Sequence, residues 1–318
     1  MPATLHITNG DSVQLRDTGL PGEVLTWKDV LHEGPVPCGL SLDQLRPIRA
    51  HFLAEGSGQL ESTILGELEK RDRTLAGFAE FEEVVLWFEH DLYDQLQLIQ
   101  ILDWFSRKDL GKTKLSLICT DRYLGMLTPD ELLELYPKRV PVSPGKLELA
   151  ARAWEAFSAA DPNSIVELFQ EDTSDLPYLQ GALLRHLEQF PSTRNGLSRT
   201  ERQILEIADA GLSRVGSVFC ADRDREERIF MGDLVFNTYM HRLANARVPL
   251  VEIDRDEKLF WNAEVAITAE GRALLRAEFD NVRVNGIDRW LGGVHLHGSR
   301  VWRWDRERGK LEFAPPLG

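Results

Sequence analysis

The sequence predicts an α/β protein with a Rossmann-like, mostly parallel sheet in residues 1–125, a helical extension in 126–190 and a winged-helix-like α+β domain in 191–318. Three observations lead to this prediction. In the first region, short apolar runs alternate with stretches of helical periodicity, which is typical of a parallel sheet with right-handed crossovers. The second region carries mainly helix signals. The third has helices followed by short strands and a hairpin pattern, the outline of a winged helix-turn-helix.

The α/β region opens with a single β-α-β unit. Residues 5–7 form a short apolar strand, and the polar turn 9–12 can cap a helix that begins near Val13. Glycine and proline at 19–22 end this helix, and an apolar run over 23–27 forms the second strand. The two strands of such a unit run parallel.

Helices and strands continue to alternate after this unit. Serine and aspartate open a helix over 41–53, and a longer charged helix covers 61–81. The apolar run 84–88 is a buried strand. The helix over 95–105 places Leu96, Ile99, Leu102 and Phe105 roughly on one face. Residues 114–119 form the fourth strand.

The middle region contains four helix signals. A threonine-proline pair at 128–129 supplies a cap and a first helical residue, and the acidic residues after it suit the helix dipole. Another helix covers 143–157, and two shorter helices cover about 164–170 and 178–190. The proline-rich and glycine-containing segment 191–196 is a linker.

The last region begins with a capping box, in which Ser198 is followed three residues later by Glu201. This pattern starts a helix. The remaining predicted elements are helices over 234–245 and 268–275, strands over 248–253 and 263–267, and a hairpin over 301–313.

Charge restricts the classes of partner. The net charge is −14, with 17 basic and 31 acidic residues in 1–190 and 20 of each in 191–318. An acidic surface repels a nucleic-acid backbone unless a cation intervenes. Nucleic-acid contact is therefore expected only through 191–318.

Composition indicates a cytoplasmic globular protein. Hydrophobic residues make up 43% and charged residues 28% of the chain, which is ordinary for such proteins. No run of about 18 apolar residues is present, so we expect no membrane span. The segment MPATLHITNG lacks the basic and apolar stretches of a secretory signal. The three cysteines are widely spaced, which fits reduced thiols better than disulfides or a cysteine-based zinc site.

Polar side chains follow every strand of the predicted sheet. They are Asn9, Asp11 and Ser12 after the first strand, Asp29, His32 and Glu33 after the second, Glu89, His90, Asp91 and Asp94 after the third, and Asp121 after the fourth. Because the carboxyl ends of parallel strands meet at one edge of a sheet, where α/β proteins bind ligands, we expect these groups to converge.

Carboxylates and imidazoles together can hold a divalent metal ion or form an acid–base pair. We expect Asp29, His90 and Asp91 to be metal ligands. His32, His90 and Asp91 are the expected catalytic groups. The residues expected to bind a small-molecule or nucleotide-like ligand are Asn9, Asp11, Ser12 and Glu33.

Purely structural roles compete with these assignments. Asp11 or Ser12 can act only as a helix cap, and Asp94 can serve only the dipole of the following helix. His32 can bond to the backbone of its proline-bracketed loop, and Asp29 can cap that loop. No glycine-rich phosphate loop, Walker motif or serine-hydrolase elbow is present.

The last region offers weaker candidates. His295 and His297 alternate and can share a face and a metal ion, but no third ligand is obvious. Arg289–Trp290 and Trp302–Trp304 mix arginine with aromatic side chains that can stack on bases, although hairpin packing explains the tryptophans more simply. The helix over 234–245 carries few base-reading groups, so a protein partner suits this region slightly better than DNA.

Several motifs resemble a known family. LHITNGDS, GEVLTWKDVLHEGPVP and LWFEHDLYDQLQLIQIL are similar to the bacterial family called domain of unknown function 1835. GDLVFNTYMHRL, ITAEGRALL, IDRWLGGVHL and the terminal WRWD resemble its usual C-terminal companion, domain of unknown function 3658. Together the motifs cover most of the chain. The resemblance implies a cytoplasmic bacterial protein and assigns no activity or catalytic residue.

Two functions fit the sequence. The first is metal-assisted hydrolysis or transfer at a phosphate-containing or nucleotide-like ligand, with the turn at 9–12 holding an anion. The second is regulation, in which a ligand-sensing α/β domain is coupled to a winged-helix module that binds DNA or a protein.

Overall fold

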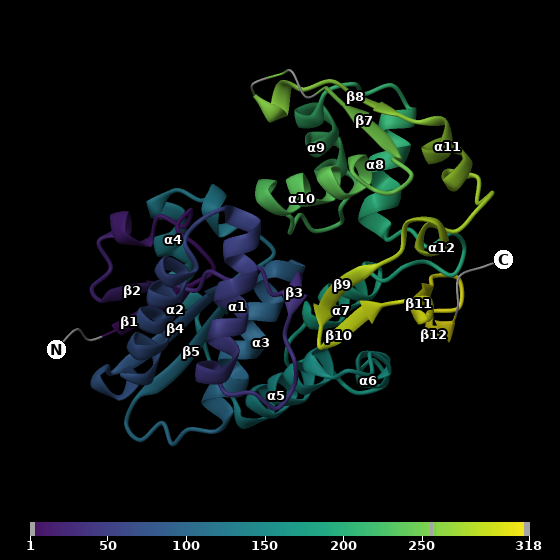
Figure 1. Cartoon of the computed structure of the whole chain (residues 1–318). Helices are drawn as coiled ribbons and strands as arrows, with labels where there is room; N and C mark the ends of the chain where they lie inside the picture. Colours follow the sequence, from purple (N-terminus) through teal and green to yellow (C-terminus); the bar gives the residue numbers. More distant parts are fainter. Residues whose placement is uncertain (1–3, 255–256, 258, 315–318) are drawn as a thin grey trace. The chain divides into compact units, whose positions relative to one another are not determined.

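The computed structural model describes residues 4–254, 257 and 259–314. The chain divides into two compact units, Met1–Leu183 and Leu184–Gly318 (Figure 1). The division falls inside one helix, α7 (Leu179–Leu187). The domain limits proposed from the sequence, near residues 125 and 190, stay predictions.

The first unit contains a five-stranded sheet in the order β2-β1-β4-β5-β6 (Figure 1). β1 pairs in parallel with β2 and β4, β4 pairs in parallel with β5, and the short edge strand β6 is antiparallel. The predicted α/β class with a mostly parallel sheet is therefore confirmed. The strands are β1 (Thr4–Thr8), β2 (Glu23–Thr26), β4 (Glu83–Phe88), β5 (Lys114–Cys119) and β6 (Val140–Pro141).

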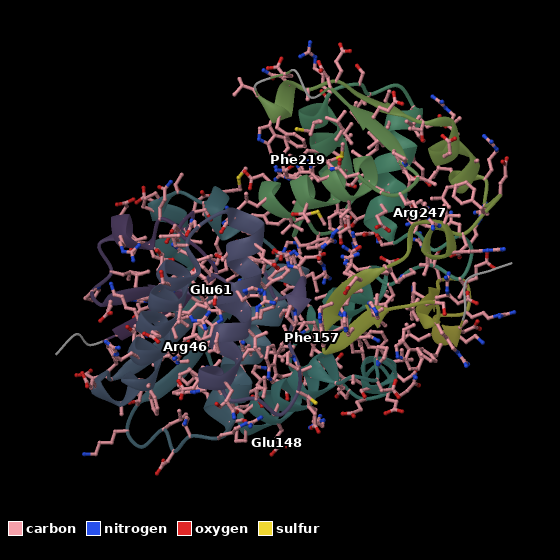
Figure 2. The ribbon with its side chains drawn as sticks, viewed as in Figure 1. Arg46, Glu61, Glu148, Phe157, Phe219 and Arg247 are labelled. Carbon is pink, nitrogen blue, oxygen red and sulfur yellow. The ribbon has the colours of Figure 1, made fainter. Side chains whose placement is uncertain are left out.

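Four long helices accompany this sheet: α1 (Leu42–Ser57), α2 (Glu61–Ala76), α3 (Leu92–Ser106) and α5 (Pro144–Ser158). α1 packs on α2, where Arg46 Nε pairs with Asp72 Oδ2 at 2.9 Å and His51 Nδ1 pairs with Glu61 Oε2 at 2.9 Å (Arg46 and Glu61 are labelled in Figure 2). The shorter elements are β3 (Gly34–Pro35), α4 (Pro129–Leu135), α6 (Asn163–Leu168) and the 3-10 turns η1 (Leu15–Thr18), η2 (Phe78–Glu80), η3 (Leu124–Met126) and η4 (Tyr136–Lys138).

Apolar side chains pack against both faces of the central strand β4. Val85 and Trp87 lie in one core cluster with residues of η1, η3 and α4, including Leu124 and Leu132. The alternate residues of β4 point to the opposite face, because successive side chains of a strand alternate, and α3 contacts β4. α3 in turn packs on α5. Burial on both faces explains why β4 is a continuous apolar run.

Two predicted helices differ in the structure. No α-helix begins near Val13, and only the 3-10 turn η1 forms, ended by Gly19 in the left-handed conformation (φ 73°). Val13 and Leu15 are both buried, a spacing of two that an α-helix cannot place on one face. The predicted long helix after α1 stops at Ala76, where Gly77 is the C-terminal cap, and the chain continues as η2.

The second unit is helical at first and then forms small antiparallel sheets. The predicted C-terminal hairpin is confirmed, whereas α9, α12 and the β9–β10 hairpin were not predicted. In the described part of the chain, no helix is long and apolar enough to cross a membrane. The elements are α8 (Arg199–Asp209), α9 (Val215–Asp224), α10 (Asp233–Ala244), β7 (Val251–Ile253), η5 (Phe260–Asn262), β8 (Val265–Ile267), α11 (Ala269–Leu275), α12 (Asn281–Asn285), β9 (Asp288–Gly292), β10 (Val294–His297), β11 (Val301–Asp305) and β12 (Lys310–Ala314).

Candidate functional site

The carboxyl ends of β1 and β4 meet where the strand order of the sheet reverses. From β1 the chain passes to β2 on one side and then to β4 on the other side of β1. Ligand sites of parallel α/β sheets lie at such a reversal. Asn9, directly after β1, donates from Nδ2 to Asp94 Oδ2 at 2.7 Å and to Glu89 Oε1 at 3.3 Å. Hydrogen bonds therefore join the two strand ends that the sequence predicts to converge.

Three carboxyl groups follow β4, and we call Glu89, Asp91 and Asp94 the strand-end cluster. Each offers an oxygen that lies within 4.8 Å of the other two. The residues are only 5%, 3% and 1% exposed, respectively. The local sequence fixes this arrangement, because β4 ends at Phe88 and α3 begins at Leu92. The short turn between them supplies Glu89 and Asp91, and the first turn of α3 supplies Asp94.

Main-chain N–H groups hold the carboxylates of the strand-end cluster in place. Asp91 caps α3 by accepting a hydrogen bond from the Asp94 N–H at 3.1 Å. Asp94 Oδ1 accepts from the Glu89 N–H at 2.7 Å, and Glu89 Oε1 accepts from the Leu124 N–H at 2.8 Å. Gln95 Nε2 donates to the Glu89 carbonyl at 2.5 Å. These bonds fix the positions of all three carboxyl groups before any ligand binds.

Burial raises the pKa of every carboxyl group in the strand-end cluster. For Glu89, burial outweighs the hydrogen bonds from Leu124 and Asn9. For Asp91, burial and the neighbouring Glu89 carboxylate raise the pKa to about 7. For Asp94, burial and the carboxylates of Asp91 and Glu89 raise the pKa well above its ordinary value. The cluster therefore favours uptake of a proton or a cation near neutral pH.

His90 lies within the same turn, but its ring packs between two tyrosines. The ring centroid is 5.2 Å from that of Tyr123 and 5.8 Å from that of Tyr178. His90 is buried, at 8% exposure. Within the described residues, its nitrogens are not part of the group of donor atoms that brings Glu89 and Asp91 together. His90 is therefore next to the strand-end cluster in sequence, but its ring nitrogens do not belong to the group of possible metal-ligand atoms that these described residues form.

Asp29 forms a buried ion pair with Arg49 of α1. Arg49 Nη2 lies 2.6 Å from Asp29 Oδ1, and Arg49 Nε lies 3.0 and 3.2 Å from the two carboxylate oxygens. Arg49 also donates to the carbonyls of Val30 at 3.1 Å and Glu33 at 2.8 Å. The sequence predicts Asp29 as a metal ligand, whereas the structure places it in a bidentate pair that shapes the loop carrying His32 and Glu33.

His32 is buried beside Tyr93, the second residue of α3. Their ring centroids are 6.0 Å apart and the rings meet edge to face. The Tyr93 hydroxyl donates to the Asn9 carbonyl at 3.2 Å, and Gln97 Nε2 donates to the Asp29 carbonyl at 3.1 Å. Burial raises the pKa of Tyr93, so its hydroxyl stays a donor. Two side chains of α3 therefore connect the turn after β1 with the loop after β2.

Asp11, Ser12 and Asp121 are exposed, unlike the strand-end cluster. Asp11 forms an ion pair with Lys28, and the hydrogen bond from Lys28 lowers the pKa of the Asp11 carboxyl group. The anion-binding role predicted for Asp11 and Ser12 relied on the N-terminus of an α-helix near Val13. Because the 3-10 turn η1 replaces that helix, no α-helix N-terminus is present among the described residues there to attract an anion.

Sequence reasoning missed several buried polar side chains of α1 and α3 that bond to residues following β2 and β4. Three glutamines of α3 are at most 2% exposed, and Gln100 Oε1 accepts a hydrogen bond from Trp27 Nε1 at 2.9 Å. One sequence signal could have indicated them: α3 is apolar around its whole circumference, so its polar residues must be buried too. Arg49 carries no such signal, because it lies in an ordinary charged helix. The three glutamines are Gln95, Gln97 and Gln100.

Comparison with known proteins adds no relative. No protein-family model matches the chain, and a search of curated proteins finds no significant match. The family resemblance of the sequence motifs therefore stays a prediction.

Proposed function

We propose that the first unit binds a divalent metal ion through the strand-end cluster and uses it for hydrolysis or group transfer at a phosphate-containing or nucleotide-like ligand. The observation that carries this proposal is the meeting of three buried carboxyl groups at the reversal of strand order. Carboxylate oxygens favour Mg²⁺ or Mn²⁺. Burial and the neighbouring carboxylates raise the pKa of Asp91 and Asp94, and a bound cation would offset both effects.

The acidic character of this part of the chain supports a role for the cation in ligand binding. Residues 1–190 carry 31 acidic and 17 basic side chains. A phosphate group is repelled by such a surface unless a metal ion lies between them. The same ion would polarise the phosphate and lower the pKa of a bound water molecule. We assign proton transfer to His90, which lies in the turn, and to His32, which packs against Tyr93 of α3. The Asp29–Arg49 pair supports the loop that carries His32.

Calorimetric titration of the full chain with Mn²⁺ and Mg²⁺ tests the metal site. We expect one ion per chain, and at least about tenfold weaker binding in Asp91→Asn and Asp94→Asn. Asp103→Asn is the matched control, because Asp103 is another buried aspartate of α3 whose carboxylate pairs with Arg107 at 2.7 Å, outside the cluster. Undetectable Mn²⁺ binding, or equal binding in all variants, would contradict the proposal.

Turnover is tested separately with a panel of phosphoesters and nucleotides in the presence of Mn²⁺. We expect activity that is lost in Asp91→Asn and reduced in His90→Ala, while Mn²⁺ binding survives in His90→Ala. Metal binding without any turnover would leave a ligand-binding site and remove the enzymatic part of the proposal.

A second candidate function is binding of a macromolecule through a winged-helix module. We base it on the element order of the second unit, in which α8, α9 and α10 precede β7 and β8. The segment before α9 adds a third strand-like pairing: Val265 N donates to the Ser213 carbonyl at 2.8 Å, and Arg214 forms an antiparallel bridge with Glu264. Three helices with a three-stranded wing are the pattern of this fold.

The surface of α10 and η5 favours a protein partner over DNA. Leu234, Leu259 and Trp261 are 58%, 64% and 36% exposed, which is unusual for side chains that would face phosphates. Duplex DNA titrated against the full chain at low salt decides between the two partners. Binding that falls steeply with salt would support DNA, and absence of binding at low salt leaves a protein partner.

A further inference from the structure

The β9–β10 hairpin presents four side chains on one face. Asp288 pairs with His297 across the strands, and Trp290 pairs with His295. Side chains alternate along each strand, so these residues share a face, while Leu291 and the other alternate residues are buried on the opposite face. The register of the hairpin therefore brings the Asp288 carboxylate beside two histidines that follow it by seven or more residues in the sequence.

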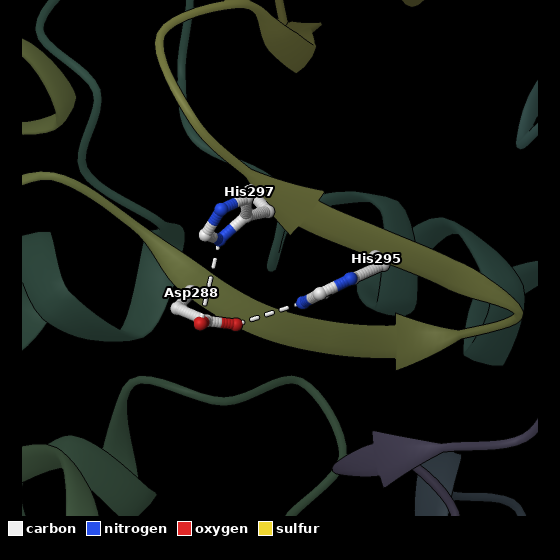
Figure 3. Close-up of side chains that lie close together, drawn as sticks. All are labelled: Asp288, His295 and His297. Carbon is white, nitrogen blue, oxygen red and sulfur yellow. Dashed lines mark hydrogen bonds and ion pairs between the residues drawn. The ribbon is translucent and has the colours of Figure 1, made fainter.

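The three polar side chains converge on one point (Figure 3). His295 Nε2 lies 2.7 Å from Asp288 Oδ1, and His297 Nδ1 lies 3.4 Å from Asp288 Oδ2. One donor atom from each residue lies within 4.8 Å of the other two. The ring of Trp290 stacks on that of His295 at a centroid distance of 4.5 Å and an angle of 2°. This stacking holds the imidazole of His295 in the orientation that points Nε2 at Asp288.

We propose that Asp288, His295 and His297 form a zinc site. Zinc in proteins takes His nitrogen at about 2.0–2.1 Å and carboxylate oxygen at about 2.0–2.2 Å, so tetrahedral donors lie about 3.3 Å apart. The two nitrogen–oxygen distances, 2.7 Å for His295 and 3.4 Å for His297, lie on either side of this value. Two imidazole ligands select zinc over Mg²⁺ and Ca²⁺, which prefer oxygen.

The exposure of the site indicates what the ion would do. The side chains of Asp288, His295 and His297 are 69%, 39% and 66% exposed. Three protein donors leave the fourth tetrahedral position open to solvent, as in zinc sites that bind a water molecule or a ligand, whereas structural zinc sites are closed by four protein donors.

Calorimetric titration of the full chain with ZnCl₂ tests this proposal. We expect one zinc ion per chain at this site, with at least about tenfold weaker binding in each of His295→Ala, His297→Ala and Asp288→Asn. His241→Ala is the matched control, because His241 is another exposed histidine of the same unit, stacked on Phe260 and outside the cluster. MgCl₂ should not compete.

Two further measurements keep this zinc site distinct from the strand-end cluster. Zinc binding at the hairpin should persist in Asp91→Asn, so that failure of the one proposal does not decide the other. Cobalt(II), added in place of zinc, should quench a component of tryptophan emission that is absent in Trp290→Phe, because Trp290 stacks on a ligand. Zinc affinity unchanged in the His295→Ala/His297→Ala double variant, or no zinc bound by the unaltered chain at 100 µM, would overturn the proposal.

Discussion

The Arg49–Asp29 ion pair is predicted to be a main determinant of stability in the first unit. The two side chains are 2% and 1% exposed, and Arg49 satisfies both carboxylate oxygens. Arg49→Met removes the positive charge and leaves the Asp29 carboxyl group buried without its partner. Breaking a buried pair in this way costs about 3–5 kcal/mol, so we expect a loss of about 4 kcal/mol in the free energy of unfolding.

Urea denaturation, with hydrogen exchange of peptides from the sheet to assign the loss to the first unit, measures this change. Asp29→Asn/Arg49→Met should be less destabilised than the two single changes added together, by about 2 kcal/mol, because neither charge is then left alone. Arg152→Met is the control, since Arg152 and Glu171 form an exposed pair worth at most about 1 kcal/mol. A loss below about 1 kcal/mol in Arg49→Met, or strict additivity in the double variant, would refute the reasoning.

Two further predictions concern stability. Burial and the Glu226 carboxylate raise the pKa of Asp222 from 3.8 to about 7, so its contribution to stability is full below pH 4 and is lost as the pH rises through 7. At 1.36 kcal/mol per pKa unit, this loss of stability is about 4 kcal/mol. Asp222→Asn should therefore protect α9 from hydrogen exchange at pH 8 but not at pH 4. Equal protection at both pH values would contradict the assignment. Gly34→Ala should destabilise the first unit by roughly 2 kcal/mol or more in urea, because Gly34 has φ +78° and a Cβ there would lie 2.5 Å from the Phe52 ring; a change under about 0.5 kcal/mol would show that the loop adapts.

The elements that the sequence predicted correctly are those with local signals. Ser41, Thr128 and Ser198 each cap a helix with a reciprocal capping box, and such a cap depends only on residues three apart. The apolar run of β4 indicated a strand because it is buried on both faces. α9 was missed because Arg214, the residue before it, makes no side-chain cap, so tertiary packing rather than local sequence defines its start.

The candidate site was predictable in position and not in its contacts. Strand ends of a parallel sheet share an edge, so the meeting of Asn9 with the turn after β4 followed from the fold class. The partner of Asp29 did not, because Arg49 lies 20 residues away on a helix whose orientation the sequence does not specify. The proposed third ligand of the His295–His297 pair was equally unpredictable, since only the hairpin register places Asp288 opposite His297.

The most direct test of the strand-end cluster is a crystal of the full chain soaked in Mn²⁺ and measured at the manganese absorption edge. The proposed function predicts one anomalous peak bonded to oxygens of Glu89, Asp91 and Asp94, and its absence in crystals of Asp91→Asn. A saturated soak that leaves these carboxyl groups without a peak would contradict the central claim, and the raised pKa values would then reflect a shared proton.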